Sequence, residues 1–246
     1  MPTGLKSLLI GLSLIVAFPA ALADNHLPRI NLYTENYGDF NYSLDGRDFA
    51  HFRDDIGGES TEVVKLMFDR AGVDYRMRLR AWSVSYERAL ERPNHGVFST
   101  GRTEFRENLF EWIGPVGQYS WILLKRSGNP LTVNSLEDIR NLRIGGYQGD
   151  AATTYLENQG FNVSALPNES LNAQRLVQNQ IDVWVTSDVN GFKIAEETGF
   201  SQVEEAFRIR TVGLYLAMNP LSHAEVLSRL HDAYDELVAS GEIQLR

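Results

Sequence analysis

Residues 142–160 read LRIGGYQGDAATTYLENQG, and they predict a strand, a tight turn and a helix in that order. Residues 142–147 have the length and composition of a short buried strand. Asp150 can cap a helix by accepting hydrogen bonds from its free main-chain N–H groups, and Gly160 can end that helix. A strand followed directly by a capped helix is the repeating unit of an α/β fold, in which helices cover a parallel or mixed sheet.

The same alternation continues through the rest of the chain. In the first half, the patterns predict a strand over residues 29–34, a helix over 60–71 that stops at Gly72, a strand over 73–79 and a short helix after Trp82 capped by Ser83 or Ser85. In the second half, they predict a capping box at Ser135 and Asp138, a helix over 170–179, a buried strand over 181–185, an extended segment over 207–218 and a last helix from a capping box at 222–225 to Gly241.

The N-terminus predicts a secreted protein. Lys6 precedes an apolar run over residues 8–18, and Ala21-Leu22-Ala23 has the small-residue pattern of a signal peptidase site, so residues 1–23 are expected to be a cleavable signal peptide. The run is shorter than the roughly 18 apolar residues of a membrane helix. We therefore expect the mature chain in the periplasm.

Composition excludes several classes of function. The sequence contains no cysteine, which rules out disulfides, thiol catalysis and cysteine metal sites. Its five histidines are scattered without metal-ligand spacing, so no metal and no cofactor is expected. A formal net charge of -9 argues against nucleic acid as a partner. Solubility explains this charge more simply than attraction of cationic substrates does.

Four segments together resemble a known family. They are YTENYGDF at 33–40, FSTGRTEFRE at 98–107, SLEDI at 135–139 followed by RIGGYQGD at 143–150, and QIDVW at 180–184. Their order and spacing resemble the family 3 extracellular solute-binding proteins, which serve ABC transporters for polar amino acids. The resemblance covers nearly the whole mature chain.

The resemblance implies a two-lobed α/β fold of the periplasmic-binding-protein type II class. Each lobe would hold a mixed sheet of five strands flanked by helices, with the ligand cleft between the lobes. Lobe 1 would comprise residues 24–118 and 217–246, and lobe 2 would be inserted as residues 119–216. The two connecting strands would cross between lobes near Tyr119 and Leu216.

In such a family, a Thr-x-x-Arg pattern supplies the arginine that binds a ligand carboxylate, and here the pattern falls on Thr103 and Arg106. A guanidinium matches a carboxylate with two parallel charge-assisted hydrogen bonds. Arg106 could instead pair with Glu104 or Glu107. Arg102 is an additional basic residue that could be a second anion contact or a surface salt bridge.

Turn residues on both lobes are further candidates for the binding site. Ser99, Thr100 and Gly101 precede the arginine, and their hydroxyl and N–H groups could meet the same carboxylate, or they could form an ordinary turn. On the facing lobe, Gly149 and Asp150 occupy the corresponding turn. Asp150 is expected chiefly to cap its own helix, and it would then compete with an anion for the N–H groups.

Two rings and three polar residues complete the candidate site. Tyr37 and Trp82 could wall the ligand, although large aromatic residues are often core. The resemblance places the carboxylate for a ligand ammonium just after the strand over 181–185, where this sequence has Ser187 followed by Asp188. Glu35 could share that role.

These residues predict a periplasmic substrate-binding protein that is monomeric, closes around a small carboxylate or amino acid, and delivers it to the membrane permease of an ABC transporter. Two alternatives stay open. A receptor coupled to a membrane sensor would use the same closure. A dehydratase-like enzyme would need acid and base groups, for which Glu35, Asp150, Asp182 and Asp188 are candidates by position alone.

Overall fold

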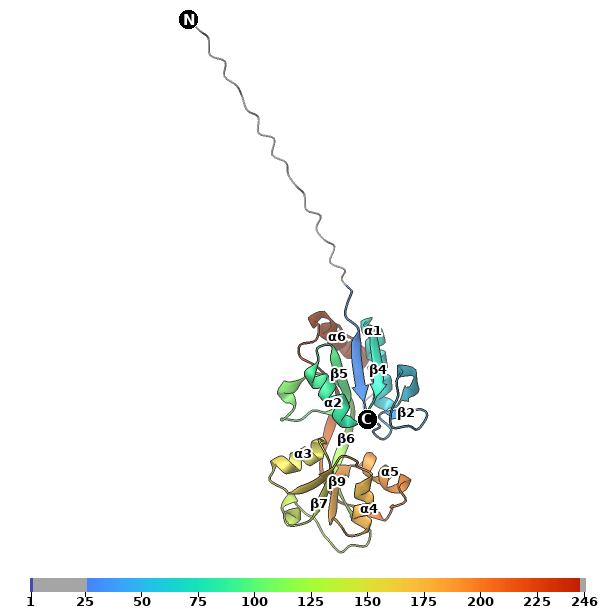
Figure 1. The fold of residues 1–246 in the computed structure, drawn as a ribbon, viewed down its shortest axis with the longest axis vertical. Coiled ribbons are helices and arrows are strands. Elements are labelled where there is room, and N and C mark those ends of the chain that lie inside the picture. Colours follow the sequence, from blue (N-terminus) through green and yellow to red (C-terminus); the bar gives the residue numbers. More distant parts are fainter. Residues whose placement is uncertain (2–25, 244–246) are drawn as a thin grey trace.

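A computed structural model describes Met1 and residues 26–243. The expected signal peptide over residues 1–23 therefore lies outside the described residues, apart from Met1. The described chain forms two stacked α/β lobes (Figure 1). Its strands are joined in one order, β4-β1-β5-β10-β6-β9-β7-β8, beside a separate two-stranded β2-β3 ladder. None of the described helices is long and apolar enough to cross a membrane.

The elements divide between the lobes as follows. The first lobe contains β1 (Ile30–Thr34), β2 (Tyr42–Ser43), β3 (Ile56–Gly57), α1 (Glu59–Ala71), β4 (Tyr75–Leu79), α2 (Trp82–Glu91), β5 (His95–Gly101) and α6 (Ala224–Ser240). The second lobe contains β7 (Ile144–Tyr147), α3 (Ala151–Asn158), β8 (Val163–Leu166), α4 (Leu171–Val177), β9 (Val183–Ser187) and α5 (Asn190–Glu197). Short 3-10 turns lie at Arg53–Asp55, Glu107–Leu109 and Leu136–Ile139.

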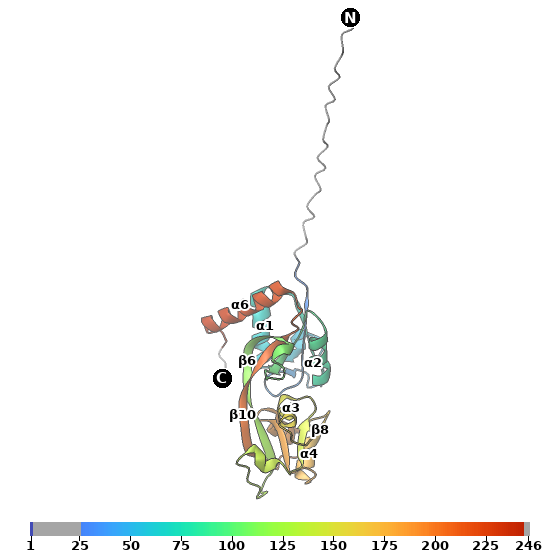
Figure 2. The same ribbon diagram turned by 90° about the vertical axis from the view of Figure 1, so that its left-hand side faces the viewer.

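Two long antiparallel strands, β6 (Glu111–Arg126) and β10 (Val203–Met218), run through both lobes along one side of the molecule (Figure 2). In the first lobe β10 pairs with β5, and in the second β6 pairs with β9. Each lobe thus has a mixed sheet of five strands that includes β6 and β10. The lobe boundaries expected near Tyr119 and Leu216 stay predictions; the register pairs Tyr119 with Val212 and Leu216 with Ile113.

Local capping interactions lie where the sequence predicted them at the end of α1, at the start of α3 and at Ser135. Gly72 ends α1 with φ of 63°, and its N–H bonds to carbonyls of the last turn. Asp150 caps α3, as expected, by accepting from the N–H groups of Ala152 at 2.8 Å and Thr153 at 3.3 Å. The capping box of Ser135 with Asp138 is also confirmed, although it begins only a 3-10 turn.

Two expected helix caps are wrong, and one helix was missed. Neither Ser83 nor Ser85 caps α2, because Ala81 stands at the cap and the Ser85 hydroxyl donates to the Thr34 oxygen at 3.0 Å. Ser222 does not cap α6, because its hydroxyl accepts from the Asn94 N–H at 3.0 Å. Helix α5 was not predicted at all, since its sequence has no side-chain cap to announce it.

The core continues from one lobe to the other along β6. Ile113, Tyr119, Trp121 and Leu123 of this strand are all buried in one apolar cluster that includes residues of both lobes. The lobes therefore share two strands and part of the core and are not joined by a loose linker.

Candidate ligand-binding cleft

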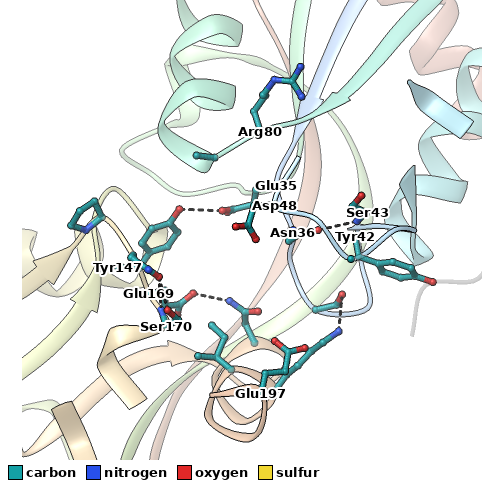
Figure 3. Close-up of a pocket in the computed structure, with 18 residues that line it drawn as sticks. Glu35, Asn36, Tyr42, Ser43, Asp48, Arg80, Tyr147, Glu169, Ser170 and Glu197 are labelled. Atoms are coloured by element: carbon teal, nitrogen blue, oxygen red, sulfur yellow. Dashed lines mark hydrogen bonds between the residues drawn. The ribbon is translucent and has the colours of Figure 1, made fainter. Parts of the chain in front are cut away.

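The carboxyl ends of parallel strands from both lobes face each other across the cleft. In the first lobe β1 runs parallel to β4 and β5, and in the second β7 runs parallel to β8 and β9. Ligands of open α/β sheets bind outside these strand ends. A cavity of about 670 Å³ lies here, lined by first-lobe residues such as Glu35 and second-lobe residues such as Tyr147 and Glu169 (Figure 3).

Arg106 is buried at the junction of the lobes with 7% of its surface exposed. Its guanidinium donates to the main-chain oxygen of Gly101 at 3.2 Å and to that of Gly149, on the other lobe, at 2.9 Å. The group also lies over the rings of Trp82 and Tyr86, at 5.2 Å and 5.1 Å from their centroids. Among the described residues it forms no ion pair, so neither Glu104 nor Glu107 neutralises it.

Trp82 closes one wall of the cleft from the first lobe. Its indole N–H donates to the same Gly149 oxygen at 3.0 Å, and only 7% of the residue is exposed. Gly149 adopts φ of 75°, a conformation that favours glycine, and this turn directs its oxygen at the two donors. Trp82, Arg106 and Gly149 therefore contact one another, and their role in ligand binding stays a prediction.

Tyr37 is buried, with 8% of its surface exposed, and it is not among the residues that line the cavity. Its ring meets the edge of the Tyr119 ring at a centroid distance of 5.7 Å, and its hydroxyl is hydrogen-bonded to Ser187 at the end of β9. Burial, the largest effect, raises the pKa of this hydroxyl well above 10, so it stays protonated. The hydrogen bond between Tyr37 and Ser187 thus links the first lobe to the second.

The turn before Arg106 is tightly held. Ser99 has φ of 56° and donates its hydroxyl to Asn41, while the buried Thr100 hydroxyl donates to the Val97 oxygen at 3.2 Å. Gly101 lies against the second lobe, since an added Cβ there would come within 3.4 Å of Ala151. Thr103 is half-buried, and its oxygen accepts the Arg106 N–H at 3.0 Å.

Asp150 lies close enough to Arg106 for their charges to interact. Burial raises the pKa of the Asp150 carboxyl, whereas Arg106 and the N–H groups of α3 lower it. The two side chains nevertheless form no direct ion pair. The N–H groups that a ligand anion could have used at this helix are occupied by Asp150 itself.

Two predicted residues are engaged outside the cavity. Arg102 pairs with Glu107 on the surface, with Nε 2.8 Å from a carboxylate oxygen, and lies over the ring of Tyr215. Asp188 accepts from the Ser120 N–H at 2.9 Å and from Arg208 at 2.6 Å. The structure therefore does not bring Arg102 or Asp188 together with Arg106.

Two carboxylates approach the cavity from opposite lobes. Glu35, directly after β1, accepts from the Tyr147 hydroxyl of the second lobe at 3.2 Å (Figure 3). Glu169, between β8 and α4, accepts from Thr186 and from Asn190, both at 2.7 Å. Burial, the largest effect, and repulsion from Glu169 and Asp150 raise the pKa of Glu35 well above its usual range.

Tyr147, Glu169 and Asn190 were not predicted as site residues. Tyr147 ends a predicted strand, so its position at the carboxyl end of that strand was a usable signal. Glu169 lies in a connection without any motif, and Asn190 lies in the unpredicted α5, so no pattern pointed to either. In residues 26–243 no group of three or more histidine or acidic side chains is placed to hold a metal ion.

No protein-family model matches this chain, and no curated protein matches it. Solved structures do match. A histidine kinase sensor domain with similarity to periplasmic binding proteins has a TM-score of 0.75 and 18% identity, covering 88% of this chain and 92% of that chain. An ancestral arginine-binding protein bound to arginine has a TM-score of 0.71 and 17% identity, covering 88% and 95%.

The arginine-, lysine- and histidine-binding protein ArtJ from Geobacillus stearothermophilus also matches, with a TM-score of 0.69 and 14% identity over 87% of this chain and 91% of that chain. At these identities the likeness shows the fold. The predicted two-lobed architecture of the periplasmic-binding-protein class is therefore confirmed.

Proposed function

We propose that this chain is a periplasmic substrate-binding protein of an ABC-type transporter. It binds a small polar carboxylate, an amino acid or a related compound, by closing its two lobes, and it presents the closed form to a membrane permease. The signal-like N-terminus supports export. The three solved structures named above are binding or sensor proteins, which supports binding over catalysis.

The observation that carries the proposal is the state of Arg106. A buried guanidinium normally pairs with a carboxylate, because an uncompensated buried charge is costly. Here it forms no ion pair among the described residues, and its hydrogen-bond partners there, the oxygens of Gly101 and Gly149 and the Tyr86 hydroxyl, are neutral. A ligand carboxylate in the cleft would replace one neutral acceptor with a charged, two-pronged one, and such hydrogen bonds are stronger.

Hydrogen bonds and an ion pair that span the cleft support the proposed closure of the lobes. Besides the two bonds to Gly149, the Tyr147 hydroxyl reaches Glu35 and Lys193 pairs with Asp39 at 3.5 Å. A ligand that touches both lobes stabilises this closed arrangement over an open one by its differential affinity. Bending of the shared strands β6 and β10 would allow this change.

A ligand screen tests the proposal. The mature chain, refolded after ligand removal, is screened by thermal shift against amino acids and small organic acids, since a ligand of the folded form raises the midpoint. Arg106→Ala should abolish the shift of any carboxylate that scores. Arg102→Ala is the matched control, because Arg102 pairs with Glu107 at the surface, and it should keep the shift.

If no small molecule raises the midpoint, or if Arg106→Ala keeps the shift, the proposal fails. A receptor role is the second candidate, because the sensor domain of a histidine kinase shares this fold with a TM-score of 0.75. In that case the same ligand would bind, but the closed form would be captured by a membrane sensor instead of a permease. Pull-down with each class of membrane partner separates the two roles.

A further inference from the structure

We propose that the second lobe holds a binding site for a phosphate group at its end away from the cleft. A cavity of about 490 Å³ lies at the amino ends of β7, β8 and β9, where Ile144, Ser164 and Ile181 line it. The ligand cleft lies at the carboxyl ends of the same strands. The two sites therefore occupy opposite ends of one sheet, and this inference does not depend on the proposed function of the cleft.

The charge of this cavity is opposite to that of the protein. Arg140, Arg143 and Arg175 line it, and the described residues that line it include no aspartate or glutamate. The whole sequence, in contrast, carries a formal net charge of -9. Three guanidinium groups at one cavity create a local positive potential that attracts anions.

Arg175 has no acidic partner among residues 26–243. Its guanidinium donates to the main-chain oxygen and the hydroxyl of Ser164, at 3.1 Å and 2.8 Å, and to the Asn172 side chain at 2.8 Å. All three acceptors are neutral, and partial burial lowers the pKa of Arg175. These hydrogen bonds orient the guanidinium without neutralising its charge, and a bound anion would neutralise it.

The other two arginines keep donors for a ligand. Arg143 donates to Asp182 through Nε and Nη2, at 3.1 Å and 2.6 Å. Arg140 donates to Glu137 through the same two nitrogens, both at 2.6 Å, and lies over the Phe161 ring at 4.5 Å from its centroid. Neither acid lines the cavity. A guanidinium has five N–H donors, so three of each group remain outside these pairs.

A phosphate group suits this cavity better than a single carboxylate does. A carboxylate offers two oxygens and one charge, which one guanidinium satisfies, whereas a terminal phosphate offers three oxygens and about two charges at neutral pH. Arginine is also the side chain that matches phosphate with two parallel hydrogen bonds. Neutral hydrogen-bonding groups complete the lining, at Asn141, Asn162 and Gln180. The phosphate can belong to a soluble ester or to a lipid head group, because both present the same oxygens.

Titration followed by backbone NMR locates the binding site. The labelled mature chain is titrated with sodium phosphate and with sodium pyrophosphate at constant ionic strength, against sodium chloride alone, because salt screens exposed charges. We expect saturable shifts confined to the amides of residues 140–145, 162–164 and 175–181. Pyrophosphate carries more negative charge and should bind more tightly than phosphate.

Arg175→Gln and Arg143→Gln should each weaken phosphate binding by about fivefold or more. In the second variant Asp182 keeps its hydrogen bond from the main-chain N–H of residue 143, at 2.8 Å, so the fold should survive. Arg175→Lys keeps the charge but loses the planar donor group, and it should retain part of the affinity. The amide spectrum of each variant without phosphate shows whether it folds.

Arg229→Gln is the matched control. Arg229 pairs with Glu225 on α6 of the first lobe, and 46% of its side chain is exposed, close to the 42% of Arg140. This variant loses the same positive charge away from the cavity, so its phosphate affinity should change by no more than about twofold. Arg106→Ala should also keep the shifts at residues 140–145, because the cleft is not involved.

Vesicles identify the source of the phosphate group. The chain is sedimented with vesicles of phosphatidylglycerol and, separately, of phosphatidylcholine. Binding to phosphatidylglycerol alone that is lost in Arg143→Gln assigns the site to an anionic lipid head group. Binding of the soluble phosphates without binding to either vesicle assigns it to a soluble phosphate or phosphate ester.

Three results overturn the proposal. Shifts that centre on Arg106 and Gly149 and vanish in Arg106→Ala would place the anion in the cleft. Affinity unchanged in both Arg175→Gln and Arg143→Gln would show that these arginines do not contact the anion. Absence of saturable binding to phosphate, pyrophosphate and both vesicles would show that the three arginines serve the fold alone. None of these results bears on the ligand screen of the cleft, so the two proposals fail separately.

Discussion

Arg106 on the first lobe donates to the main-chain oxygen of Gly149 on the second lobe at 2.9 Å. The indole N–H of Trp82 donates to the same oxygen at 3.0 Å. The closed cleft thus uses the guanidinium that a ligand carboxylate would need. A ligand carboxylate would replace the Gly149 oxygen as the acceptor of the Arg106 hydrogen bond. The hydrogen bond from Trp82 to Gly149 would remain, so the lobes would stay closed when the ligand binds.

Trp82→Phe tests whether the hydrogen bond from Trp82 to Gly149 stabilises the closed form. The substitution removes the N–H donor but keeps a ring beneath Arg106. The closed form should lose one hydrogen bond, which is worth about 1 kcal/mol, and ligand affinity should fall about fivefold. Calorimetric titration measures the affinity, and small-angle scattering measures the fraction of closed molecules.

Trp112→Phe is the control for that experiment. The Trp112 indole donates to the Glu107 oxygen at 3.0 Å, a contact within the first lobe. Trp112→Phe should lower the free energy of unfolding by a similar amount, about 1 kcal/mol, without changing ligand affinity. Equal losses of affinity in the two variants would show that the Trp82 bond does not act through closure.

Asp150 provides a second test, of the balance between capping and anion binding. Asp150→Ala should lower the free energy of unfolding by about 1 kcal/mol, because α3 loses its cap, whereas Asp150→Asn keeps an acceptor and should cost less. Asp150→Asn also removes a negative charge near Arg106, so this variant should bind a carboxylate ligand more tightly. Urea unfolding and calorimetric titration measure the two effects. Equal destabilisation by Ala and Asn would contradict the capping role.

The sequence predicted the fold through local signals that the structure preserves. The capped strand–helix unit around Asp150 and the stop at Gly72 depend on chemistry within a few residues, so they could be identified directly. Arg106, Trp82 and Gly149 were also predicted as site residues and do meet. Their meeting itself depends on the pairing of β6 and β10, which no local pattern specifies.

The rest depended on contacts between distant residues. Glu169 faces the cavity because α4 and β9 position its loop, and its partner Asn190 begins a helix that carries no capping signal. Arg102 pairs with Glu107 and not with a cleft anion, because the turn between them directs both side chains to the surface. Spacing alone could not separate Arg102 from Arg106.

Asp188 is expected to stabilise the fold without contributing to ligand affinity. Asp188→Ala removes the acceptor of the Ser120 N–H and the partner of Arg208, and the half-buried contact should cost about 1–3 kcal/mol of unfolding free energy. Arg208→Gln, which removes only the more exposed ion pair, should cost less. Unfolding in urea and ligand titration measure both variants. A marked loss of affinity in Asp188→Ala at unchanged stability would instead place Asp188 at the ligand.

Glu169 should make stability depend on pH. Burial, aided by Asp150, raises the pKa of its carboxyl from about 4.5 to about 7, against the hydrogen bonds of Thr186 and Asn190. A raised folded-state pKa means that the folded chain favours the protonated form. Its contribution to stability is therefore complete below about pH 4.5 and is lost as pH rises through about 7, a change of up to about 3 kcal/mol.

Glu169→Gln lacks this titration, so its unfolding free energy relative to the wild type should increase between about pH 5 and about pH 8. Glu35 and Asp150 also have raised pKa values and titrate in both proteins, and because repulsion from Glu169 helps to raise the pKa of Glu35, the difference reports Glu169 together with its effect on Glu35. Urea unfolding at both pH values measures the difference, with Glu197→Gln, at an exposed residue of the same cavity, as the control that should show none. A difference independent of pH would contradict the raised pKa of Glu169, because it would mean that this carboxyl does not titrate between the two pH values.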